Sequence, residues 1–72
     1  MDNQKKTVEA LREDVFAEAV ELFEGDRKAA LAWLNQPLRA IGHEVPSEYM
    51  NSPENIQKVK DVIGRLEHGV WT

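Results

Sequence analysis

The sequence predicts an all-α fold, a small compact bundle of three main helices plus one short helix. Apolar residues recur at the three- and four-residue spacing of a helical face in the first and the last third of the chain. Proline and glycine separate these stretches, and small polar residues stand where helices would begin. No stretch carries a strand signal. The 72 residues suffice for one domain.

The first main helix is predicted over residues 8–24. Thr7 is placed to cap its N-terminus, and Gly25 supplies a left-handed stop. Residues 1–7 are polar and are expected to form a disordered N-terminal segment. The apolar positions that share one face of this helix are Val8, Leu11, Val15, Ala19 and Leu22.

The second main helix is predicted over residues 27–35, with Asp26 as its cap. Pro37 ends it, because proline disfavours helical backbone in the residue before it. Trp33 is a large aromatic residue in the middle of a small chain, so we expect the other helices to pack around it.

A connection follows over residues 36–45, in which Ile41 points inward and Gly42 permits a positive φ angle. Pro46 suits the first position of a short helix over residues 46–50.

The last main helix begins after Ser52, which is placed to cap it, and Gly69 is expected to end it. Gly64 lies inside this helix, where it costs roughly 1 kcal/mol against alanine. The apolar face consists of Ile56, Val59, Ile63 and Leu66, with Val62 alongside.

A chain of this length buries only about 60% of the surface that its unfolded form exposes, so we expect association with a partner to add stability. The chain has no cysteine, which excludes disulfides and thiolate metal sites. His43 and His68 lie far apart and predict no metal site. The expected core residues are Leu11, Val15, Ala30, Trp33, Leu34, Ile41, Pro46, Val59, Ile63 and Leu66.

Charge and hydropathy exclude further classes. Thirteen acidic residues stand against nine basic ones, and the net charge of −4 offers no basic stripe for nucleic acid. No apolar run approaches the roughly 20 residues of a membrane span. The first residues carry no secretion signal, so we expect a cytoplasmic protein.

The sequence gives little support for a catalytic site, so we expect that the protein is not an enzyme and binds no cofactor. Ser47 and Ser52 have no histidine beside them in sequence, and both are interpreted as helix caps. Neither a glycine-rich phosphate loop nor a pair of carboxylates in an apolar setting is visible.

The C-terminal tail, residues 69–72, is the unusual feature, because termini are normally polar. It reads Gly69-Val70-Trp71-Thr72 and brings two large apolar side chains to the end of the chain. Trp71 either folds back onto the domain's own core or anchors in a pocket of another protein, since tryptophan is enriched at binding hot spots.

A set of residues in the centre and at the end of the chain forms a recognisable pattern, in the order Ala30, Trp33, Leu34, Ile41, Gly42, Pro46, Val59, Ile63, Arg65, Leu66, Glu67, His68, Gly69, Val70 and Trp71. In order and spacing, this pattern resembles the toxin-binding domain of the antitoxin Xre/MbcA/ParS family. The resemblance covers roughly residues 10–72. Asn55 stands where relatives often have glycine.

The resemblance implies an antitoxin that neutralises a RES-domain toxin, an enzyme that consumes NAD or uses it for ADP-ribosylation. Residues 8–72 would form the toxin-binding domain, and the C-terminal end would block the NAD site. The resemblance also implies a homodimer. Many relatives carry a DNA-binding helix-turn-helix ahead of this domain, which this sequence lacks, so we expect no nucleic-acid binding by this chain. The residues expected to contact the toxin are Arg65, His68, Gly69, Val70, Trp71 and Thr72.

An alternative is a small self-associating adaptor domain that inhibits no toxin. Deleting residues 70–72 separates the two. A folded chain that no longer binds the toxin indicates an inhibitor, whereas an unfolded chain indicates that the tail belongs to the core.

Overall fold

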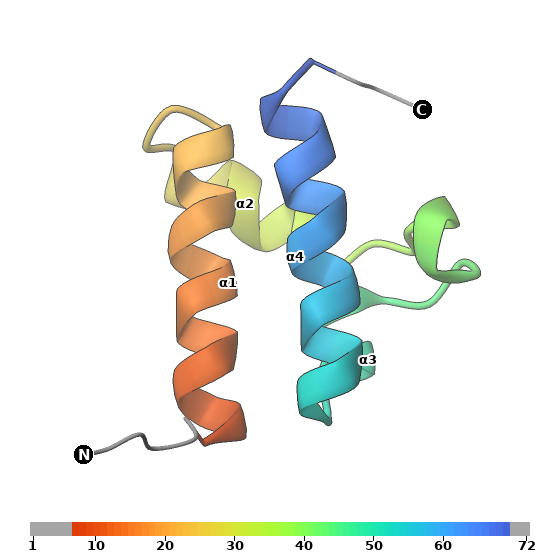
Figure 1. The fold of residues 1–72 in the computed structure, drawn as a ribbon. Coiled ribbons are helices and arrows are strands. Elements are labelled where there is room, and N and C mark those ends of the chain that lie inside the picture. The colour runs from red at the N-terminus through yellow and green to blue at the C-terminus, as the bar shows by residue number, and fades with distance from the viewer. Residues whose placement is uncertain (1–6, 70–72) are drawn as a thin grey trace.

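Two helices of 15 residues each carry the fold, and both run in the same direction side by side (Figure 1). The computed structural model describes residues 7–69. Because parallel neighbours need a return path, the segment between the two long helices crosses back along the bundle. The helices are α1 (Val8–Leu22), α2 (Arg27–Leu34), the 3₁₀-helix η1 (Arg39–Ile41), α3 (Pro46–Tyr49) and α4 (Pro53–Glu67). The all-α prediction of three main helices and one short one is confirmed.

Side-chain caps begin the three main helices at the predicted residues. In each case a side-chain oxygen accepts a hydrogen bond from a backbone N–H in the first turn, which would otherwise have no partner. The pairs are Thr7 with Ala10 at 3.1 Å, Asp26 with Ala29 at 3.0 Å, and Ser52 with Asn55 at 3.2 Å.

The helix ends differ from the predictions by one or two residues. α1 ends at Leu22 rather than at residue 24, because Glu24 and Gly25 both adopt left-handed backbone, with φ of 58° and 90°. The Gly25 N–H turns back to donate to the Val20 carbonyl at 2.8 Å. α2 and α3 each stop one residue before their predicted ends.

The core lies mainly between α1 and α4, and its fully buried side chains come from both. The expectation that the helices pack around Trp33 is wrong. Trp33 is half-buried at the edge of the core, tilted against Phe23 with ring centroids 6.4 Å apart. Leu11 and Leu66 are also half-buried. The buried apolar residues are Val15, Ala19, Ala30, Leu34, Ile41, Met50, Ile56, Val59, Val62 and Ile63, and Pro46 is buried with them.

The connection between α2 and α3 is held by its own hydrogen bonds. Gly42 has the positive φ that was expected (77°), and His43 follows it with φ of 67°. This reversal brings Leu38 opposite Glu44, whose carbonyl accepts the Leu38 N–H at 2.9 Å. η1 packs against α4, and its Ile41 is buried there.

Candidate functional site

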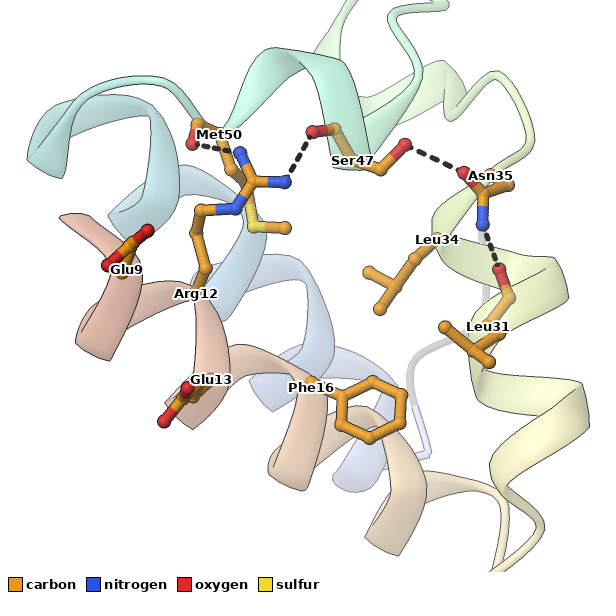
Figure 2. A pocket seen from close by; sticks show the side chains of 9 residues that line it. All are labelled: Glu9, Arg12, Glu13, Phe16, Leu31, Leu34, Asn35, Ser47 and Met50. Atoms are coloured by element: carbon orange, nitrogen blue, oxygen red, sulfur yellow. Dashed lines mark hydrogen bonds between the residues drawn. The ribbon is translucent and has the colours of Figure 1, made fainter.

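A groove of about 430 Å³ opens where α1, α2 and α3 meet (Figure 2). Its walls combine apolar side chains of α1, α2 and the C-cap of α3 with polar groups of α1, of Asn35 and of Ser47. The lining residues are Glu9, Arg12, Glu13, Phe16, Leu31, Leu34, Asn35, Ser47 and Met50. An apolar hollow with a few fixed polar groups is the usual form of a binding surface.

Arg12 shapes the α3 end of this groove. Its guanidinium donates through Nη1 to the Met50 carbonyl and through Nη2 to the Ser47 carbonyl, both at 2.9 Å. Ser47 belongs to a helix of only four residues and Met50 is the C-cap of that helix, so neither carbonyl has a helical partner. The arginine therefore fixes α3 on α1, and with it one wall of the groove.

Ser47 continues the network toward α2, as Figure 2 shows. Its hydroxyl donates to Oδ1 of Asn35 at 2.8 Å, and the Asn35 amide donates to the Leu31 carbonyl at 2.8 Å. The interpretation of Ser47 as a helix cap is wrong, because the N-cap of α3 is Val45, which makes no side-chain cap. Ser47 instead ties α3 to the C-terminal end of α2.

Exposed groups around the groove are apolar on α2 and acidic on α1. Leu31 exposes 49% of its surface. Within residues 7–69 it is the one large apolar residue that is exposed. Glu9 and Glu13 are exposed on the α1 side. The surface thus offers an apolar contact flanked by negative charge.

The C-terminal end of α4 forms the second candidate surface. Arg65 and His68 are both exposed, and a spacing of three residues puts them on neighbouring positions of the helix. Arg65 lines a polar hollow of about 380 Å³ together with Asp61 of α4 and residues of η1 and α3. Gly69 follows with φ of 82°, the left-handed backbone of a helix stop.

The structure thus brings together three of the six residues expected to contact a toxin, namely Arg65, His68 and Gly69. Val70, Trp71 and Thr72 lie outside the described residues. None of the three described residues contributes to the groove of Figure 2, so the two surfaces are separate.

The sequence interpretation did not assign a role to Arg12. Arg12 stands three residues before Val15 and seven before Ala19, both buried, and so shares their face. That spacing indicates an arginine whose side chain is partly buried. Its acceptors are 35 and 38 positions away in sequence and could not be predicted.

Within the described part of the chain, no group of three or more histidine, cysteine, aspartate or glutamate side chains could hold a metal ion. Over the same residues, none of the helices is both long enough and apolar enough to pass through a bilayer.

The chain is a small all-α domain with a groove and an exposed helix end. The chain belongs to the family of antitoxin Xre/MbcA/ParS C-terminal toxin-binding domains, whose family model matches residues 18–69. The match contains α2, α3, α4 and the three candidate residues at the end of α4. The part of α1 that carries Arg12 and Phe16 precedes it.

Two curated relatives share this similarity. The Antitoxin Xre of Yersinia enterocolitica (serotype O:8 / biotype 1B) is 41% identical over 54 residues, which is 75% of this chain and 36% of the relative. The Antitoxin Xre of Photorhabdus laumondii subsp. laumondii is 36% identical over 56 residues, which is 78% of this chain and 38% of the relative. The chain spans little more than a third of the length of the curated relatives it matches.

Proposed function

We propose that this chain is the toxin-binding domain of an antitoxin, formed by residues 8–72, and that it inhibits a RES-domain toxin. Such a toxin consumes NAD or uses it for ADP-ribosylation. The observation that carries the proposal is the match of residues 18–69 to a family of toxin-binding domains. The proposed action takes place in the cytoplasm.

The C-terminal end is the proposed blocking element. The end of α4 supports this role, because Arg65 and His68 are exposed and available to a partner. The left-handed backbone of Gly69 lets the chain leave the helix axis. In the proposal, Trp71 fills an apolar pocket of the toxin and the Thr72 carboxylate pairs with an arginine that otherwise holds an NAD phosphate.

The proposal gives this chain a binding role without catalytic residues, cofactor or metal of its own. It also includes a homodimer and assigns no nucleic-acid contact to this chain. The acidic balance supports the last point, since nucleic-acid binding is dominated by basic side chains.

The test compares the full chain with a variant that lacks residues 70–72, each mixed with the product of the adjacent gene, which the proposal takes to be the toxin. NAD loss is measured with and without the antitoxin chain, and circular dichroism monitors folding. We expect the shortened variant to stay folded and to lose inhibition.

Two results would overturn the proposed blocking role. In the first, the shortened variant inhibits as well as the full chain. In the second, the variant unfolds, which would mean that Trp71 belongs to the domain's own core. A full chain that self-associates but leaves NAD consumption unchanged would favour an adaptor domain instead.

A further inference from the structure

We propose that the groove between α1, α2 and α3 is the homodimer face, and that Leu31 of each protomer enters the groove of the other across a two-fold axis. The inference rests on the self-association included in the proposed function and names its surface. It does not involve the C-terminal end of α4.

The apolar part of the surface is self-complementary. Leu31 exposes 49% of its surface at the edge of the groove, and Phe16 is half-buried in the facing wall (Figure 2). Leu34 and Met50 are buried beneath them. In a two-fold pair the same patch serves both partners, so each exposed leucine finds one hollow and each hollow receives one leucine.

The charges along the groove are also self-complementary. Glu9, Glu13 and Phe16 follow one another at helical spacing on α1, and Glu9 and Glu13 are exposed. Lys28 and Leu31 lie one turn apart on α2, and Lys28 is exposed near the turn that joins α1 to α2. Glu9 and Glu13 therefore stand at one end of the surface and Lys28 beyond the other, where Glu24 and Asp26 of the turn are exposed as well.

A two-fold axis through the middle of the groove exchanges these ends. The carboxylates of one protomer then face the ammonium group of its partner, whereas a parallel arrangement would place like charges together. Electrostatic complementarity of this kind selects the register of an interface. This charge pattern favours a second copy of the chain over an unrelated apolar segment as the partner, because the chain itself carries both the carboxylates and the ammonium group that would pair.

The groove is built before binding. Arg12 holds α3 through two carbonyls, and Ser47 and Asn35 connect α3 to α2. At the far end, the Arg27 guanidinium lies 5.6 Å from the centre of the Phe16 ring. A surface fixed in this way loses little side-chain freedom on association.

Sedimentation velocity of the full chain over a range of concentrations tests the proposal. We expect a concentration-dependent dimer, and Leu31→Asp should raise its dissociation constant by about tenfold or more, because a buried apolar anchor is replaced by a charge. Leu31→Ala is the milder companion variant, and circular dichroism verifies that both remain folded. Lys58→Glu, at an exposed position of α4 outside the groove, is the control.

Charge reversal tests the two-fold arrangement. Glu13→Lys and Lys28→Glu should each weaken the dimer by about two- to fivefold, and the double variant should regain the original affinity. Failure of that rescue would overturn the two-fold register.

A chain that stays monomeric, or a dimer that Leu31→Asp leaves unchanged, would overturn the groove as the dimer face. Neither result bears on the proposed toxin inhibition, which is assigned to residues 70–72 and is measured separately. Conversely, a dimer that Leu31→Asp weakens would support the groove as the dimer face even if the chain fails to inhibit the toxin.

Discussion

Arg12 and Met50 are 38 positions apart, and Nη1 of Arg12 donates a hydrogen bond of 2.9 Å to the Met50 carbonyl. A second bond of the same length reaches the Ser47 carbonyl. One side chain of α1 thereby satisfies the backbone of a helix that is only four residues long. Isolated helices of that length are not stable in water, so the position of α3 depends on contacts such as these.

Arg12→Met should lower the free energy of unfolding by about 1–3 kcal/mol, because it keeps much of the side-chain volume but leaves two carbonyls without their charged donor. Urea denaturation measures the change. Arg39→Met, at an exposed position of η1, is the matched control and should have little effect. Equal stability of the two variants would contradict the role of Arg12.

Ser52→Ala should destabilise the domain by about 1 kcal/mol, because Ser52 caps α4 through the Asn55 N–H. Ser47→Ala should cost less, since it removes an exposed side-chain bond to Asn35 and no helix cap. Thermal unfolding of both variants distinguishes them. A larger loss for Ser47→Ala would contradict this ranking of the two hydrogen bonds.

Gly64→Ala should stabilise the domain by about 1 kcal/mol, because alanine favours the helix and an added Cβ at this position meets nothing within 4 Å. Gly42→Ala should instead destabilise by about 1 kcal/mol. The space around Gly42 is equally open, but its φ of 77° strains any residue with a Cβ. Urea denaturation of the two variants should therefore shift in opposite directions, and a shift in the same direction would contradict this account.

A short Gly-Ser extension after Thr72 should weaken toxin inhibition about tenfold or more, because it moves the carboxylate away from its proposed arginine partner. The same extension before Met1 is the matched control and should leave inhibition unchanged. Inhibition of NAD consumption measures both. Equal potency of the two extended chains would remove the carboxylate from the proposed mechanism.

The main helices could be predicted because their signals are local. The caps at Thr7, Asp26 and Ser52 and the left-handed Gly42 depend on residues close in sequence. The early end of α1 could not be predicted, since left-handed backbone at Glu24 runs against the preference of a residue with a Cβ.

The groove of Figure 2 could not be predicted from the sequence, for a physical reason. Its geometry depends on contacts between residues far apart in sequence, such as Arg12 with α3 or Ser47 with Asn35. Trp33 illustrates the same limit, because size favours burial but does not determine position. The core centres instead on smaller residues such as Val15 and Ile63, which lie where α1 and α4 meet.

The parallel course of α1 and α4 puts Thr7 and Gly69 at opposite poles of the domain (Figure 1). Fifteen residues of helix span on the order of 20 Å, so the two poles are well separated. A tag, fluorophore or immobilisation handle joined ahead of Thr7 would project away from the pole that carries Arg65 and His68. Surface attachment through that side therefore leaves the pole that carries Arg65 and His68 accessible for binding measurements.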